Sequence, residues 1–273
     1  MFEGNVRLIS MLGVLTVIVI ASLMLDYFHI LRRPVRISMG IALLAMGAGA
    51  VLTLGAVLPD NHFYGQVCAQ VQTKHKVVAL TFDDGPYSPY TEQILDILQE
   101  RNVPATFFLV GSNAAKHPQL VKRIVDEGHQ IGNHTYTHVD LLKLDRAQAI
   151  EEIDRTNAVL KSEVGFVPHV ARPPHGFRDP AIMDVMASRG LSVVEWSVMS
   201  KDWTNPGEEA IVERTINKVK NGSIVLLHDG DGIAAKADRS QTVAATRKII
   251  EKLQAQGYRF VTVDEILKSR EAK

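Results

Sequence analysis

The sequence predicts an α/β protein, an irregular (β/α)7-8 barrel preceded by two transmembrane helices. The barrel is indicated by short apolar runs, typical of buried strands, that alternate with amphipathic stretches from residue 73 onward. Parallel strands need helical crossovers, and about seven such units suit a barrel better than an open sheet. The two spans are indicated by long uncharged runs near the N-terminus. We therefore expect a membrane anchor at 1–60, a linker at 61–72 and one domain at 73–273.

The two N-terminal runs cover about 8–25 and 37–58 and contain no charged residue. Helices of about 18–22 apolar residues are long enough to cross a hydrocarbon core of about 30 Å. Arg32, Arg33 and Arg36 lie between the runs, so the positive-inside rule predicts a cytoplasmic connector and an extracytoplasmic N-terminus and domain. The alternatives are a cleaved signal peptide or a buried hairpin. The barely basic N-terminus and the presence of a second apolar run argue against a signal peptide. The polar connector argues against a buried hairpin.

The domain after residue 73 is predicted to alternate strands and helices along its whole length. Pro118 and Gly128 mark the two ends of one helix, and Asp145 is the expected N-cap of the next. Strands are expected at 77–82, 105–111, 130–134, 169–174, 191–198, 222–229 and 258–263. Helices are expected at 90–102, 117–129, 145–165, 179–190, 208–222 and 240–257.

Polar side chains follow most of the predicted strands at the point where each strand ends. Because the carboxyl ends of barrel strands meet at one mouth, we expect these side chains to converge there. They are Asp83 and Asp84, His134 and His138, Arg172 with the following "PPHG", Asp202 and Trp203, and His228 and Asp229.

A metal site would explain why two acids stand side by side at 83 and 84. Neighbouring carboxylates repel each other unless a cation intervenes. His134 and His138 have the spacing of one helical turn, and two His with one Asp leave an open position, as in catalytic zinc sites. The second acid would then be free to act as a base. The alternatives are a plain Asp-Gly-Pro turn and a solvated His pair.

Three further residues have both a functional and a plain interpretation. His228 is either a second titratable group across the site or a hydrogen-bonded imidazole at a strand end. Arg172 either orients the free carboxylate or is solvated at the surface. Trp203 and Trp196 either form a wall for a sugar face or belong to the core.

Composition excludes some classes of protein and site. The chain has 30 basic and 30 acidic residues and no net charge, so no basic surface for a nucleic-acid partner is expected. Its single cysteine, Cys68, excludes an internal disulfide and a cysteine-based metal site.

From about Val77 to Leu267 the chain resembles the polysaccharide deacetylase family, also called NodB-homology proteins or family 4 carbohydrate esterases. The resemblance lies in five motifs in the family's order. They are matched here by "TFDDGP", "HTYTH", "RPPHG", "MSKDW" and "LLH".

The resemblance implies a role for each matched residue. Asp83 would be the catalytic base and His228 the general acid, with Asp84, His134 and His138 as the metal ligands. The cofactor would be one divalent ion, Zn²⁺ in the first place, with Co²⁺, Ni²⁺ and Mn²⁺ as alternatives. The metal site would take water and the amide carbonyl of an N-acetyl sugar. A backbone N–H near His175 would help to hold the oxyanion. Supporting residues would be Arg172, Pro174, Asp202, Trp203 and Leu226, the last of these beside the acetyl methyl.

Two residues depart from the family pattern. His175 stands where tyrosine is usual, which leaves the backbone N–H in place but changes the ring. Met199 stands where the first Asp of the fourth motif is usual, an Asp that tunes the general acid in the family. The residue that tunes His228 is therefore open, with Asp202 and Asp229 as candidates.

The function expected is a metal-dependent N-deacetylase that acts on an extracytoplasmic glycan at the cell membrane, peptidoglycan or another envelope polysaccharide. One alternative is an amidohydrolase for a lipid-linked formamido or acetamido sugar. Another is a glycan-binding module without turnover. Substrate choice is expected to depend on loops, above all on the loop at 229–239.

Overall fold

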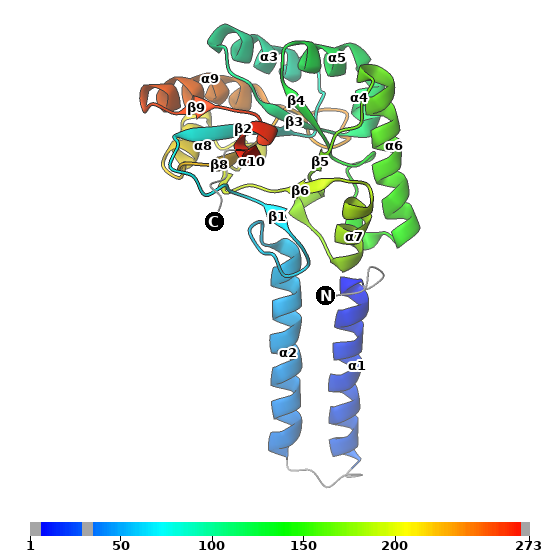
Figure 1. Ribbon diagram of the computed structural model, residues 1–273. Helices are drawn as coiled ribbons and strands as arrows, with labels where there is room; N and C mark the ends of the chain where they lie inside the picture. Colours follow the sequence, from blue (N-terminus) through cyan, green and yellow to red (C-terminus); the bar gives the residue numbers. More distant parts are fainter. Residues whose placement is uncertain (1–6, 29–34, 269–273) are drawn as a thin grey trace.

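The computed structural model describes residues 7–28 and 35–268 as a globular α/β domain with a helical hairpin projecting from it (Figure 1). The hairpin consists of α1 (Leu8–Tyr27) and α2 (Val35–Val57). Both helices are long and apolar enough to be candidate membrane spans, at Leu8–Leu25 and Ile37–Val57. Arg32 and Arg33 of the predicted connector lie outside the described residues.

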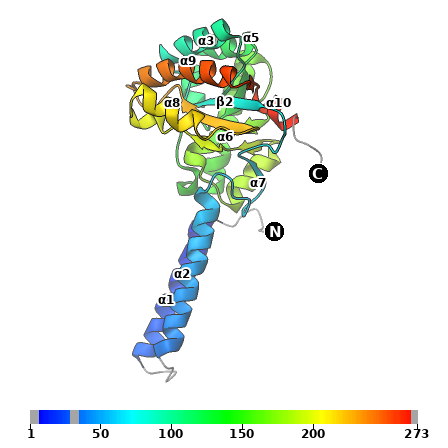
Figure 2. The ribbon, with the colours of Figure 1, turned by 90° about the vertical axis from the view of Figure 1, so that its left-hand side faces the viewer.

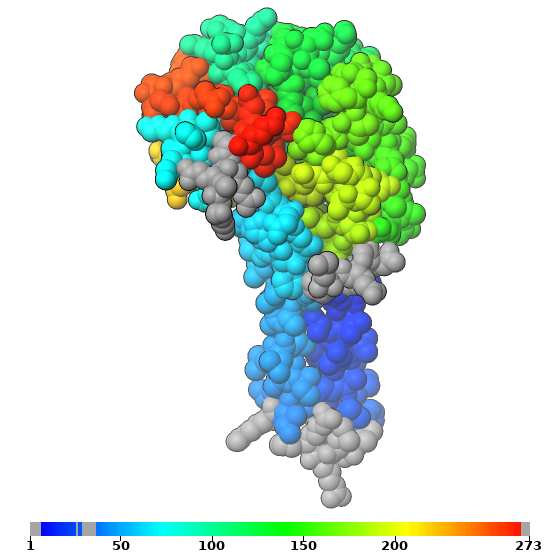
Figure 3. Space-filling model, viewed as in Figure 1, coloured from blue at the N-terminus to red at the C-terminus, as the bar shows by residue number. Residues whose placement is uncertain are grey.

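The hairpin exposes most of its apolar side chains, and its buried residues lie where it meets the domain or, like Ser22, Ser38 and Ala45, along the hairpin itself. Figure 3 shows it as a narrow stalk below the rounded body of the molecule. At the junction Leu8, Leu52, Ala56 and Tyr64 form a small buried cluster. A stalk with an apolar surface is the arrangement expected of helices that face lipid rather than protein.

The domain is built on one curled sheet of parallel strands, which confirms the predicted fold class. The strands follow the order β1-β6-β5-β4-β3-β2-β8-β7, and β9 also pairs with β2. Within the described residues the two ends of this path, β1 and β7, are not paired with each other, so the barrel is irregular and open. The strands are β1 (Val67–Cys68), β2 (Val77–Asp83), β3 (Thr106–Leu109), β4 (Gln130–Asn133), β5 (Val170–Ala171), β6 (Ser192–Val194), β7 (Val198–Met199), β8 (Ser223–His228) and β9 (Arg259–Phe260).

Helices cover the outer face of the sheet, as Figure 2 shows for α3, α8 and α9. Between sheet and helices lies the main core, in which Phe82 and Phe107 stack at 5.1 Å between ring centroids. Asp145 caps α6 through a capping box with Gln148, as the sequence predicts. The helices of the domain are α3 (Tyr90–Arg101), α4 (Gly111–Lys116), α5 (Pro118–Asp126), α6 (Arg146–Val164), α7 (Pro180–Ser188), α8 (Glu208–Ile216), α9 (Ser240–Ala255) and α10 (Val263–Lys268).

Several elements differ from the sequence prediction. The strand expected at 169–174 is reduced to Val170–Ala171, and the helix expected at 208–222 ends at Ile216. The strand expected at 191–198 breaks into β6 and β7, because the chain crosses from β1 to β8 there: Glu195 N donates to Cys68 O and Ser197 N to Ile224 O. The strand expected at 105–111 ends at Leu109 and is followed by α4. The strand expected at 258–263 is reduced to β9, and α10 follows it.

Part of the range predicted as a linker, 61–72, belongs to the sheet. Within it, β1 runs parallel to β6, with Val67 opposite Val193 and Cys68 opposite Val194. The short run was too brief for its pattern to predict a strand. The three-part division of the chain stays a prediction.

Candidate active site

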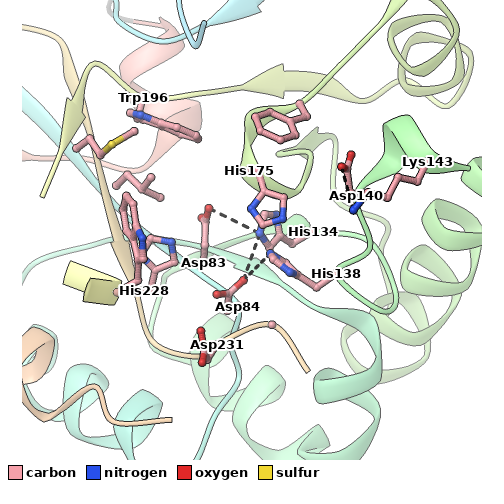
Figure 4. Close-up of a pocket in the computed structure, with 15 residues that line it drawn as sticks. Asp83, Asp84, His134, His138, Asp140, Lys143, His175, Trp196, His228 and Asp231 are labelled. Atoms are coloured by element: carbon pink, nitrogen blue, oxygen red, sulfur yellow. Dashed lines mark ion pairs between the residues drawn. The ribbon is translucent and has the colours of Figure 1, made fainter. Parts of the chain in front are cut away.

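The polar residues predicted to converge do so in one cleft at the carboxyl ends of the strands (Figure 4). The cleft has a volume of about 660 Å³. Its lining includes Asp83, Asp84, His134, His138 and His228. Asp83 and His228 are 145 residues apart in the sequence. Figure 4 shows the carboxylates of Asp83 and Asp84 facing the imidazoles of His134 and His138, with Asp140 and Asp231 farther out.

Asp84, His134 and His138 form a compact three-ligand cluster. One potential ligand atom from each lies within 4.8 Å of the others. Oδ1 of Asp84 is 3.0 Å from Nε2 of His138 and 3.4 Å from Nε2 of His134. Asp84 Oδ1 is buried, and no hydrogen-bond donor among the described residues is aligned with it. Two imidazoles and one carboxylate, whose Oδ1 has no aligned donor, fit a divalent metal with an open coordination position.

The sequence expectation that the two histidines share a helical turn is wrong. Residues 134–140 form an irregular loop in which Thr135 and His138 have positive φ angles of 66° and 57°. The loop is held from α6, because the Glu152 carboxylate accepts hydrogen bonds from the backbone N–H groups of Tyr136 and Thr137. Backbone geometry of this kind is costly and is found where a site requires it.

The surroundings of the cluster favour a bound cation. Nδ1 of His134 lies 2.6 Å from the carbonyl of Arg172, so the proton on that nitrogen leaves Nε2 free to face Asp84. Burial alone would raise the pKa of Asp84, but the two imidazoles lower it well below its usual range. Burial alone would lower the pKa of His134, but the carboxylates of Asp83 and Asp84 raise it. Both pKa shifts show that the electrostatic potential at the cluster favours positive charge there.

Asp83 stands beside the cluster and is oriented by Arg172. The buried guanidinium of Arg172 donates from Nη1 to Asp83 Oδ1 at 2.6 Å and to Thr81 Oγ1 at 2.9 Å. Its other nitrogens donate to the carbonyls of Val194 and Glu195. A planar group with four fixed acceptors holds the carboxylate in one orientation. The other oxygen of Asp83 is 3.7 Å from Nε2 of His134.

His228 is paired with Asp202, which answers the question raised by Met199. Nδ1 of His228 lies 2.9 Å from Oδ1 of Asp202, and the His228 backbone N–H donates to Oδ2. Burial by itself lowers the pKa of His228, but the Asp202 carboxylate raises it to about 9. Asp202 also accepts from Ser200 and Thr242, and its pKa is lowered despite its burial. Met199 ends β7 and lines the cleft.

Aromatic and apolar side chains form the walls of the cleft. Trp203 is partly exposed, and its ring meets that of His228 edge to face at 5.1 Å between centroids. Leu226 and Trp196 complete this side. A sugar face or an acetyl methyl would find apolar contact here.

The third motif supplies the opposite wall as a tight turn, η2 (Pro174–Gly176). Pro174 is buried at its start, and His175 adopts a left-handed backbone with φ 60°. The His175 ring lies 5.2 Å from that of His138, and burial followed by the charge of His138 lowers its pKa. The ring that replaces the usual tyrosine is therefore less readily protonated than an ordinary histidine and lies beside the three-ligand cluster.

Two important residues near the cleft were missed or misplaced by sequence reasoning. Asn113 of α4 donates to the carbonyls of Asp84 and Gly232, which ties the acid pair to the loop at 229–239. No motif pointed to it. Asp229, a candidate partner of His228, instead accepts from Thr91, and burial raises its pKa to about 7.

The loop at 229–239 borders the cleft. Asp231 and Gly232 line it, and Asp231 Oδ1 accepts from Arg239 Nη2 at 2.8 Å. Gly232 has a positive φ, and a Cβ atom there would lie 2.9 Å from Nδ1 of His138. The loop is therefore packed closely against one proposed ligand.

The chain is similar to known deacetylases over this domain. Residues 70–194 match the family model described as polysaccharide deacetylase. A peptidoglycan-N-acetylglucosamine deacetylase of Bacillus cereus is 41% identical over 211 residues, 75% of this chain and 94% of that protein. A chitooligosaccharide deacetylase of Sinorhizobium fredii is 40% identical over 188 residues, 66% of this chain and 87% of that protein.

A solved structure agrees with these relatives. It is a crystal structure of a peptidoglycan N-acetylglucosamine deacetylase in complex with 4-naphthalen-1-yl-N-oxidanyl-benzamide. It superimposes with a TM-score of 0.71 at 35% sequence identity, over 76% of this chain and 95% of that one.

Proposed function

Because the chain belongs to the polysaccharide deacetylase family, we propose that it hydrolyses the acetamido groups of N-acetylated amino sugars in an extracytoplasmic glycan, peptidoglycan or another envelope polysaccharide. The observation that carries this proposal is the cleft in which a carboxylate held by Arg172 and an imidazole held by Asp202 lie on either side of a three-ligand cluster. The similarity to glycan deacetylases supports the substrate class.

Asp84, His134 and His138 would hold one divalent ion, Zn²⁺ in the first place and Co²⁺, Ni²⁺ or Mn²⁺ as alternatives. When bound, such an ion polarises an amide carbonyl and increases the acidity of water. The buried Asp84 oxygen without an aligned donor and the two imidazoles match the ligand preference of zinc.

The protein's own residues supply the proton transfers. Asp83 removes a proton from the attacking water, and Arg172 keeps its carboxylate aimed at the cluster. The backbone N–H of His175, in the turn at Pro174–Gly176, is available to hold the developing oxyanion. His228, kept protonated by Asp202, donates a proton to the departing amine. The amide C–N bond breaks, and acetate and a free amino sugar leave.

The intact acid, base and ligand set speaks against a glycan-binding module without turnover. We also propose that α1 and α2 span the cell membrane, with the N-terminus and the domain outside. The exposed apolar surface of the hairpin supports this placement.

A second candidate substrate is a lipid-linked formamido or acetamido sugar. It is favoured because the cleft lies next to the contact between domain and hairpin. Asp140 lines the cleft. The next residue, Leu141, accepts a hydrogen bond from Arg7, which lies at the end of the hairpin that meets the domain. A cleft beside the membrane surface could receive a sugar still attached to its lipid.

A substrate panel distinguishes these proposals. The full chain in detergent, loaded with zinc, is incubated with N-acetylglucosamine oligomers, peptidoglycan and undecaprenyl-linked acetamido and formamido sugars. Mass spectrometry then detects the deacylated product, and Asp83→Asn is the control. Product from oligomers or peptidoglycan supports the first proposal, and product from the lipid-linked sugars alone supports the second. No product from any substrate with any divalent metal would refute both.

A further inference from the structure

The end of α1 that meets the catalytic domain contacts a buried carboxylate of that domain, Asp179. Oδ2 of Asp179 accepts from the backbone N–H of Leu8 at 3.1 Å and pairs with Nε of Arg7 at 3.0 Å. Its Oδ1 accepts from the N–H of Ile182, so that Asp179 caps both α1 and α7. Asp179 is 1% exposed. The first turn of α1 is therefore anchored to the domain through the buried Asp179 carboxylate.

The outer end of α2 is held by the neighbouring residue, Arg178. Its backbone N–H donates to Ala56 O, and Nη2 donates to the carbonyls of Leu58 and Asn61 at 2.5 and 2.8 Å. The last carbonyls of a helix lack partners within the helix and favour a nearby cation. Arg178 therefore does at the end of α2 what Asp179 does at the start of α1.

Both contacts lie on loops that shape the cleft. Arg178 Nη1 donates to Gly176 O, which closes the turn that carries His175. On the other side, Arg7 Nη2 donates to Leu141 O at 2.7 Å. Leu141 lies three residues after His138 and next to Asp140 of the cleft. The hairpin thus touches the metal-ligand loop and the oxyanion turn at once.

A chain of contacts connects Arg178 to the proposed base, Asp83. Arg178 Nη1 lies 3.5 Å from the buried carboxylate of Glu195, whose backbone carbonyl accepts from Arg172. Arg172 in turn holds Asp83. An apolar junction would attach the hairpin without the cost of burying these charges. Here Arg7 and Arg178 each also donate to one backbone carbonyl of a loop beside the site, Leu141 O and Gly176 O.

We propose that Arg7, Arg178 and Asp179 are positioning residues that brace the loops at 138–143 and 174–179 against the hairpin. The two apolar helices are then a working part of the active site rather than a tether, and Figure 1 shows their upper ends beside α7 and β1. The catalytic part of this inference rests on the proposed deacetylase activity, whereas the brace itself does not.

Arg7→Met tests the proposal because Arg7 lies outside the cleft yet contacts both the Asp179 carboxylate and Leu141. Arg189→Met is the matched control, since it removes an Arg–Asp pair with Asp154 at the far end of α7. Full-length chains are placed in nanodiscs of phosphatidylethanolamine and phosphatidylglycerol. Hydrogen–deuterium exchange is followed in the metal-free chain, and kcat and KM for acetate release from chitopentaose are measured after zinc loading.

We expect Arg7→Met to speed exchange at 138–143 and 174–179 and to lower kcat about tenfold with little change in KM, because small displacements of positioned groups are costly. Arg7→Lys should restore part of kcat, and Arg189→Met should leave both readouts unchanged. Unchanged exchange in these loops overturns the brace, and changed exchange with unchanged kcat overturns the positioning role. If the parent chain releases acetate neither from chitopentaose nor from any substrate of the panel described above, the proposed function fails, while the exchange pattern still decides whether the brace exists.

Discussion

Replacing Asp202 by asparagine should shift the pH range in which the enzyme works. Asp202 contributes the negative charge that faces Nδ1 of His228 at 2.9 Å. Asparagine keeps the shape and one acceptor oxygen, which can still receive the N–H of His228 and the hydroxyl of Thr242. Its amide NH₂ would face Nδ1 instead and would favour the neutral imidazole. The change therefore removes the charge with little loss of packing.

The size of the effect follows from the pKa of His228. That pKa is about 9, compared with about 6.5 for an ordinary histidine. This difference corresponds to about 3 kcal/mol in favour of the protonated ring. Burial acts in the opposite direction, and the Asp202 carboxylate makes the largest contribution that outweighs it, with smaller ones from Asp84 and Asp83. A bound dication would lower the pKa in both proteins and would leave the difference between them.

A general acid works only while it is protonated, so activity falls as pH rises through its pKa. In Asp202→Asn the alkaline limb of kcat/KM should move to lower pH by about 2 units. Initial rates of acetate release between pH 5 and 10 measure this shift. Asp231→Asn is the control, because it makes the same chemical change at a half-exposed carboxylate of the cleft. An alkaline limb that stays in place in Asp202→Asn would refute the assignment of His228 as the acid tuned by Asp202.

Three further outcomes are expected. Asp83→Asn should lower kcat by about 10²- to 10⁴-fold, the usual contribution of a general base, while elemental analysis finds the same zinc content as in the parent chain. Chelation should abolish activity and added zinc should restore it, whereas His138→Ala should lose both zinc and activity; full activity in the chelated parent would contradict a metal role. Burial lowers the pKa of His129 to about 4, so its contribution to the unfolding free energy of the metal-free chain should fall by about 3 kcal/mol as pH falls from about 6.5 to 4, because only the unfolded chain binds that proton readily. Urea unfolding should therefore show a loss about 3 kcal/mol larger in the parent than in His129→Asn, whose oxygen can replace the acceptor for Ala105 N–H.

Strands with continuous apolar runs were predictable from the sequence, because burial on both faces leaves a strong local pattern. The run at 77–82 became β2, the most connected strand, which pairs with β3, β8 and β9. The run at 191–198, which contains Ser192, Glu195 and Ser197, was predicted as one strand but changes neighbours at Glu195. A change of hydrogen-bond partner leaves no trace in hydropathy, so the break into β6 and β7 could not be foreseen.

The motif residues were predictable as a set, but their local geometry was not. Spacing alone suggested a helical turn for His134 and His138. The loop with left-handed backbone at Thr135 and His138 is held by hydrogen bonds to Glu152, which lies on a later helix. Likewise, Arg178 and Asp179 follow the third motif without any pattern of their own. Their role depends on the hairpin ends, which only the tertiary structure brings to them.

The pairing of β2 with β8 has a consequence for how the protein matures. Asp84, His134 and His138 lie within 55 residues of one another, counting both ends, and their strands β2, β3 and β4 are neighbours in both sequence and sheet. His228 joins them only when β8 pairs with β2, with Asp83 opposite His228 in register. Contacts between distant segments form late in folding because closing a long loop costs entropy. During biosynthesis the ion-binding half of the site can therefore form before its proton donor arrives, so a nascent chain could acquire its ion before it can turn over substrate.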